Sequence, residues 1–220
     1  MPHMILQGPH WFFGLDAVLE CVAGLVALLI VIASLRYMRM ARDKRYSILG
    51  SGFVLIFLAF VSQVITSLFI YHEFSEVAGI DAVIDLNNAL FLGHVAYVLL
   101  FTGGLIVLCL WALKIKDNMQ RALITALALG LAVIGIWNPL IYNATTLALL
   151  IFISAKFFLN ANEQQTALSW EVLTGFVLIT LARLAFILEP LDPSWYVGGH
   201  LAQLFGYLIL LGVLIQVVRK

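Results

Sequence analysis

Polar and ionisable side chains interrupt the apolar segments of this chain at several points, and their types are suited to binding a ligand, a proton or a metal. Polar groups are costly in hydrocarbon, so those that a membrane segment retains mark candidate functional sites. Arg183 is the strongest candidate, because a guanidinium in an apolar segment needs a partner. The full set comprises Asp16, Glu20, Gln63, His94, Tyr97, Arg183, His200, Gln203 and Tyr207.

The spacing of these residues predicts that they gather in one pocket. Asp16 and Glu20 are one helical turn apart and share a face, and His200, Gln203 and Tyr207 follow at i, i+3 and i+7. All of the polar side chains fall in the same halves of their segments, whereas the other halves are nearly pure Leu, Ile, Val and Ala. We therefore predict a polar pocket that opens toward one side of a helix bundle.

Arg183 allows three interpretations. It forms a structural ion pair with Asp16, Glu20 or Glu189 that locks the first and sixth helices together. It binds a carboxylate or phosphate ligand, or belongs to a polar network that switches. Alternatively, its side chain reaches the membrane surface.

The histidines allow a metal or haem site on the same side of the bundle. His94 and His200, with Glu20 or Asp16, are candidate ligands for a transition metal. A histidine pair on two helices also allows a b-type haem. The chain contains no HxxxH or HExxH spacing, so the ordinary role of a histidine, hydrogen bonding inside a polar pocket, competes with both. The cofactor is left open.

The composition identifies the elements that must position these residues. The chain is 63% hydrophobic and 11% charged, with a mean hydropathy of +1.06, whereas soluble domains have about 25% charged residues. We predict an all-α, single-domain (residues 1–220), multi-pass membrane protein of the plasma membrane, with lipid as its surroundings. No internal repeat is recognised. The expected helices span residues 11–35, 47–72, 87–113, 120–137, 139–160, 168–189 and 195–218.

The basic residues orient these seven helices. Apart from Arg183, all of the Lys and Arg residues follow the first, third, fifth or seventh segment: Arg36, Arg39, Arg42, Lys44, Arg45, Lys114, Lys116, Arg121, Lys156, Arg219 and Lys220. Positive charge concentrates in cytoplasmic loops. We therefore expect the N-terminus outside, the C-terminus inside and the pocket facing outward. Residues 73–86 are expected to form an outer loop with a short interfacial helix.

Two stretches carry a resemblance to prokaryotic seven-helix sensor modules of the membrane-associated sensor type. They are Gly199-His200-Leu201-Ala202-Gln203-Leu204-Phe205-Gly206-Tyr207 and the basic loop from Arg36 to Arg45. Such modules precede kinase or cyclase domains, whereas we expect no output domain after Lys220 here. The resemblance implies a stand-alone, receptor-like bundle. Retinal is not expected, because the last segment has no lysine in its middle.

The sequence thus predicts a membrane sensor or receptor-like protein that binds a ligand or a proton and signals to a separate cytoplasmic partner. A metal-dependent membrane enzyme of a hydrolase-like kind and a b-haem redox protein are the alternatives. A transporter is disfavoured, because the inner halves of the helices offer no polar path and no inverted repeat is evident. No nucleic-acid partner is expected, and a homo-oligomer is left open.

Overall fold

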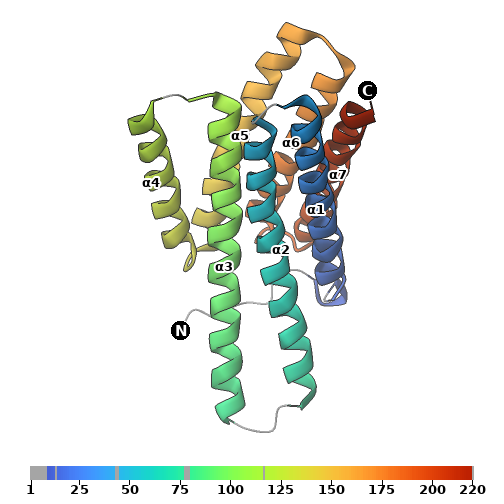
Figure 1. The fold of residues 1–220 in the computed structure, drawn as a ribbon. Coiled ribbons are helices and arrows are strands. Elements are labelled where there is room, and N and C mark those ends of the chain that lie inside the picture. The colour runs from blue at the N-terminus through green and yellow to red at the C-terminus, as the bar shows by residue number, and fades with distance from the viewer. Residues whose placement is uncertain (1–8, 13, 43–44, 77–79, 116, 220) are drawn as a thin grey trace.

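The computed structural model describes residues 9–12, 14–42, 45–76, 80–115 and 117–219, without the side chains at 10, 41, 45, 69–89 and 219. Across these residues the chain is all-helical, and seven helices are long and apolar enough to cross a membrane (Figure 1). The prediction of an all-α, seven-helix, multi-pass membrane protein is confirmed. After a 3-10 turn (His10–Phe12), the helices are α1 (Leu15–Ala41), α2 (Arg45–Glu76), α3 (Ile80–Leu113), α4 (Asn118–Gly135), α5 (Pro139–Gln164), α6 (Ala167–Leu188) and α7 (Ser194–Arg219).

Most helix boundaries follow from local chemistry. α4 and α5 are separate helices, as predicted, and they meet at Trp137-Asn138-Pro139. The Asn138 side-chain oxygen accepts hydrogen bonds from the backbone N–H groups of Leu140 (3.1 Å) and Ile141 (3.4 Å). Pro139 occupies the first helical position, where a missing N–H costs nothing. Asp117 caps α4 in the same way, by accepting from Met119 N at 3.0 Å.

The segment between the second and third helices differs from its prediction. The backbone is helical up to Glu76 in α2 and again from Ile80 in α3. No separate interfacial helix is therefore present in the described backbone between Glu73 and Leu86. At about 1.5 Å per residue, both helices are much longer than the ~30 Å hydrocarbon core. They project beyond the other helices as a hairpin (Figure 1).

Six of the helices form a closed ring. α1 packs against α2, α2 against α3, α3 against α5, α5 against α6, α6 against α7, and α7 against α1. α4 packs mainly against α3 and α5 and lies outside this ring (Figure 1). The polar residues predicted from the sequence all belong to helices of the ring.

The ring consists of two similar halves, which corrects the expectation that the chain has no internal repeat. The sequence GFVLI occurs at 52–56 in α2 and again at 175–179 in α6, and ALLI occurs at 27–30 in α1 and 148–151 in α5. The packing repeats as well. A Cβ on Gly104 of α3 would lie 2.8 Å from the Gly52 carbonyl oxygen, and a Cβ on Gly206 of α7 would lie 2.8 Å from that of Gly175. The helices α1–α3 and α5–α7 are therefore a parallel repeat.

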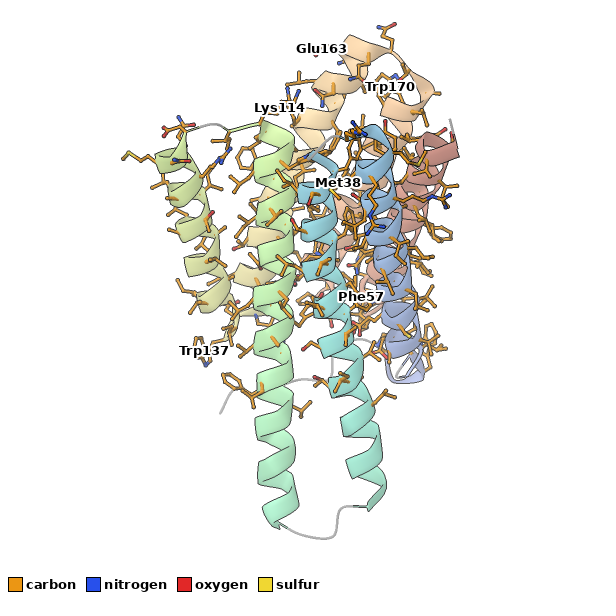
Figure 2. All side chains as sticks on the ribbon, in the orientation of Figure 1. Met38, Phe57, Lys114, Trp137, Glu163 and Trp170 are labelled. Atoms are coloured by element: carbon orange, nitrogen blue, oxygen red, sulfur yellow. The ribbon has the colours of Figure 1, made fainter. Side chains whose placement is uncertain are left out.

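The two ends of the ring differ in charge. We call the end at which α1, α5 and α7 begin the acidic end; it carries Asp16, Glu189 and Asp192. We call the opposite end, which carries Arg36, Arg42, Lys114 and Arg121, the basic end. Figure 2 shows Lys114 where α3 finishes and Trp137 at the opposite end of α4. The placement of the basic end in the cytoplasm remains a prediction.

Candidate functional site

A polar cavity lies inside the ring near the acidic end. Its volume is about 80 Å³, which corresponds to roughly two to three water molecules. Side chains from all six helices of the ring line it, so the fold brings together residues that are far apart in the sequence. The lining comprises Glu20, Gln63, His94, Tyr97, Pro139, Tyr142, Asn143, Arg183, Phe186, Tyr196 and His200.

Arg183 is the most deeply buried charged group of the cavity, with only 2% of its surface exposed. Its Nη2 donates a hydrogen bond to the Tyr97 hydroxyl at 3.3 Å. Its guanidinium carbon lies 4.2 Å from the centre of the Phe101 ring and 5.3 Å from that of Phe186. A phenyl face attracts a cation, but it cannot satisfy N–H groups that lie in the guanidinium plane.

The ion pair that the sequence suggests for Arg183 is not formed with Asp16 or Glu20. Among the described residues, the hydrogen bond of the Arg183 side chain goes to the Tyr97 hydroxyl. Asp16 lies in the first turn of α1 instead, where its Oδ1 accepts from the backbone N–H groups of Gly14 (2.9 Å) and Ala17 (2.8 Å). Glu20 is 6% exposed and lines the same cavity as Arg183, but without direct contact. The interpretation in which Arg183 reaches the surface is excluded by its burial.

Two buried donors of this cavity have no hydrogen-bond partner among the described residues. They are the Nε–H of Arg183 and the hydroxyl of Tyr142, which lies close to the Tyr97 hydroxyl but forms no hydrogen bond of good geometry with it. Guanidinium nitrogens only donate, and leaving a buried donor unpaired costs about 1–3 kcal/mol. Both groups belong to side chains that line the cavity, so the cavity is suited to a ligand that accepts hydrogen bonds.

Both predicted histidines also line the cavity. His200 is 7% exposed and packs against Tyr196 at 4.6 Å and Phe186 at 5.1 Å between ring centroids. Among the described residues, no group of three or more His, Cys, Asp or Glu side chains is arranged to hold a metal ion. The metal site at His94 and His200 therefore stays a prediction. A haem does not fit this cavity, because drug-sized ligands already need about 300–1,000 Å³.

Three predicted residues do not line the cavity. Asp16 bonds to the backbone in the first turn of α1, and Gln203 and Tyr207 lie deeper along α7 with 2% and 1% exposure. The Tyr207 ring packs edge-on against Phe60 (5.8 Å) and Phe53 (6.3 Å), and Phe60 packs against Phe101 (6.1 Å). We call Phe53, Phe60, Phe101 and Tyr207 the aromatic layer; it lies on the ring interior next to Arg183.

Sequence reasoning missed part of the lining, namely Pro139, Tyr142, Asn143, Phe186 and Tyr196. Tyr196 looks like a residue of the membrane interface beside Trp195, yet it is buried whereas Trp195 is 46% exposed. The usable signal was its spacing, since Tyr196 and His200 are i and i+4 on one helix face. Tyr142 lines the cavity near the start of α5, where its backbone also packs closely on Gly135 of α4: an added Cβ on Gly135 would lie 2.9 Å from the Tyr142 Cα.

The fold and the site define a multi-pass, seven-helix membrane protein with a polar cavity inside a ring of two similar halves. No family model matches the chain, and neither a curated protein nor a solved structure with significant similarity to it was found.

Proposed function

We propose that this protein is a membrane sensor that binds a small monocarboxylate anion at Arg183 and signals through its helices to a separate partner at the basic end. The observation that carries this proposal is the state of Arg183. It is a buried cation that pairs with neither Asp16 nor Glu20, and its Nε–H and the nearby Tyr142 hydroxyl are buried donors without a hydrogen-bond partner among the described residues.

The chemistry of the cavity favours a singly charged ligand. Arg183 is the one Lys or Arg among the lining residues, so a doubly charged phosphate would remain partly uncompensated. Phe101 covers one face of the guanidinium and leaves its N–H edge available. A carboxylate accepts such an edge well. The volume of about 80 Å³ limits the ligand to an ion with only a few heavy atoms.

Signalling would use the helices that Arg183 connects. Arg183 lies on α6 and donates to Tyr97 on α3, while Tyr142 lies on α5. A bound carboxylate that accepts from Arg183 and Tyr142 would tie α5 to α6 and change the tilt of helices that continue to the basic end. A ligand shifts such an equilibrium only by its differential affinity for the two arrangements.

Glu20 couples ligand binding to a proton. It is the one carboxylic acid among the residues that line the cavity. Two negative charges in one small buried cavity repel each other, so a bound anion favours the protonated form of Glu20. We expect acetate to bind more tightly as the pH falls, and Glu20→Gln to bind acetate more tightly than the wild type with little pH dependence.

The test is the thermal unfolding of the purified protein with acetate, with neutral acetamide as the matched ligand and with gluconate to hold the ionic strength. A ligand at 100 times its Kd stabilises by about 2.7 kcal/mol. Acetate should raise the unfolding midpoint of the wild type and of Lys156→Gln, but not of Arg183→Gln. Tyr142→Phe, which removes only a hydroxyl, should weaken the effect. Equal stabilisation by acetamide, or an undiminished acetate effect in Arg183→Gln, would refute the proposal.

Transport is a second candidate function, and the parallel repeat favours it. Transporters are often built from such repeats, with the substrate site at the interface between the halves, and the cavity here lies between α1–α3 and α5–α7. Uptake of labelled acetate into proteoliposomes distinguishes the candidates. A transporter gives uptake that Arg183→Gln abolishes, whereas a sensor binds acetate without moving it.

A further inference from the structure

Two more cavities adjoin one another at the basic end of the ring. The inner one, about 180 Å³, is lined by apolar and aromatic side chains of α1, α2, α3, α5, α6 and α7. The outer one, about 430 Å³, lies among α2, α3, α4 and α5. Tyr46, Trp111 and Phe157 line both. A ligand that passes these three rings would therefore occupy both spaces.

The inner cavity lies between the two halves of the repeat. Phe53 of α2 and Phe176 of α6 occupy equivalent positions, since each follows the glycine of a GFVLI sequence, and both line this cavity. Phe53 also belongs to the aromatic layer, so that layer lies between the inner cavity and Arg183. No Lys, Arg, Asp or Glu is among the residues that line the inner cavity, which excludes a charged occupant there.

The outer cavity carries cations at fixed positions. Lys114 and Arg121 line it, and no acidic residue does. Arg121 Nε donates to the Ile115 carbonyl at 2.7 Å, which holds its guanidinium across the connection between α3 and α4. Lys114 has a left-handed backbone (φ 52°) that ends α3, and Asp117 caps α4 directly afterwards. Lys114 and Arg121 thus place two positive charges at the outer cavity, next to the apolar inner cavity.

We propose that these cavities bind one anionic phospholipid, with an acyl chain in the inner cavity and the phosphate at Lys114 and Arg121. A basic pocket between membrane helices suits an anionic head group, and the apolar inner cavity suits the chain. Because α4 packs mainly on α3 and α5, the outer cavity lies at the side of the ring that the peripheral helix covers. The surrounding leaflet supplies such lipids.

The experiment measures lipid binding by native mass spectrometry of the delipidated full chain, titrated with phosphatidylglycerol or phosphatidylcholine of matched acyl chains. Phosphatidylglycerol should bind in a 1:1 ratio. Lys114→Gln/Arg121→Gln should weaken that binding by roughly 30-fold, since each cation contributes about 1 kcal/mol and about 1.4 kcal/mol is tenfold in affinity. Arg36→Gln/Arg39→Gln, which neutralises two exposed arginines of α1 at the same end, should leave it unchanged.

A cavity-filling variant tests where the chain lies. Val172→Phe places a larger side chain in the inner cavity and leaves both cations in place, so it should prevent phosphatidylglycerol binding. Far-ultraviolet circular dichroism and the unfolding midpoint show that each variant folds. Equal binding of phosphatidylcholine, unchanged binding in Val172→Phe, or binding of free oleate in preference to the phospholipid would each overturn the proposal.

Discussion

Arg183 and Phe60 occupy equivalent positions in the two halves of the ring. Gly52 and Gly175 are 123 residues apart (175 − 52), and the same offset relates Phe60 to Arg183 (183 − 60). Phe60 is 1% exposed and packs against Phe101 and Tyr207. The first half of the ring therefore packs an aromatic side chain where the second half buries a cation. The repeat does not need an arginine at this position in order to fold.

This comparison predicts that Arg183 is retained at a cost in stability. Replacing buried ion pairs by apolar side chains of similar volume is often neutral or stabilising, by up to about 4 kcal/mol. An apolar side chain of similar length at 183 likewise removes the desolvation cost of a buried charge, and Arg183 pairs with neither Asp16 nor Glu20. We expect Arg183→Met to raise the unfolding midpoint in the absence of acetate and to abolish the effect of acetate. Chemical unfolding in detergent measures the first effect. A large loss of stability would instead show that the contacts of Arg183 with Tyr97 and Phe101 hold the fold together.

At the scale of the helices, two glycine contacts set how closely neighbouring helices approach. Gly206 of α7 lies against Gly175 of α6 as Gly104 of α3 lies against Gly52 of α2. In each pair, small residues let one helix backbone lie directly on the other, as is common between membrane helices. The positions of His200 and Arg183 on α7 and α6 depend on this contact.

Two alanine substitutions in α7 test the role of this contact. Gly206→Ala would place its Cβ 2.8 Å from the Gly175 carbonyl oxygen, so the helices must separate. We expect a loss of about 1–3 kcal/mol. Gly212→Ala is the matched control, because an added Cβ meets no atom within 4 Å, and the helix propensity of alanine should make that variant neutral or slightly more stable. Unfolding of both variants in the same detergent gives the comparison.

The turn between α6 and α7 predicts a pH effect. Asp192 Oδ1 accepts from Ser194 N at 2.8 Å, and hydrogen bonds from the Ser194 backbone and side chain lower the pKa of Asp192 below its ordinary value of 3.8. A carboxyl group with a lowered pKa in the folded state stabilises the protein above its unfolded pKa. That contribution is lost as the pH falls through the folded pKa.

The wild type should therefore unfold at a higher midpoint than Asp192→Ala at pH 7, and the difference should decrease as the pH falls below about 4. Asp192→Asn keeps an accepting oxygen without the charge and should show a smaller difference that does not vary with pH. A difference between the wild type and Asp192→Ala that stays constant down to pH 2.5 would contradict this account of the turn.

At the scale of the whole molecule, the hydropathy of the segments and the residues that cap or end helices predict most of the architecture. The seven helices follow from apolar length, and the break at Asn138-Pro139 follows from capping chemistry. The full length of α2 and α3 could not be predicted from the sequence. The acidic residues Glu73, Glu76, Asp81 and Asp85 suggest a loop, but a helix that extends beyond the hydrocarbon core can also carry them. Two features of the site depend on how the six helices of the ring pack: the burial of Tyr196, and the absence of an ion pair between Arg183 and Asp16 or Glu20. Helix packing of this kind cannot be predicted from the local spacing of residues.

The orientation of the whole chain is open to a direct test. Single cysteines at Leu191, which is 79% exposed between α6 and α7, and at Glu163, at the opposite end of the molecule (Figure 2), are made in a variant without Cys21 and Cys109. A membrane-impermeant thiol reagent should label Leu191→Cys in intact cells, and Glu163→Cys only after the membrane is permeabilised. The reverse pattern would place the polar cavity on the cytoplasmic side.

The position of α4 outside the ring has a topological consequence. A unit of three crossings enters the bilayer on one face and leaves on the other, so two such units in direct succession would insert upside down relative to each other. One additional crossing between the two units lets both insert in the same orientation. α4 has the lowest mean hydropathy of the seven spans, 1.4, and only 17% of its span is buried. Its main contribution is therefore an odd number of crossings, and its sequence is free to vary only outside the residues that pack on α3 and α5, such as Ala132 and Gly135, and outside Arg121 of the outer cavity.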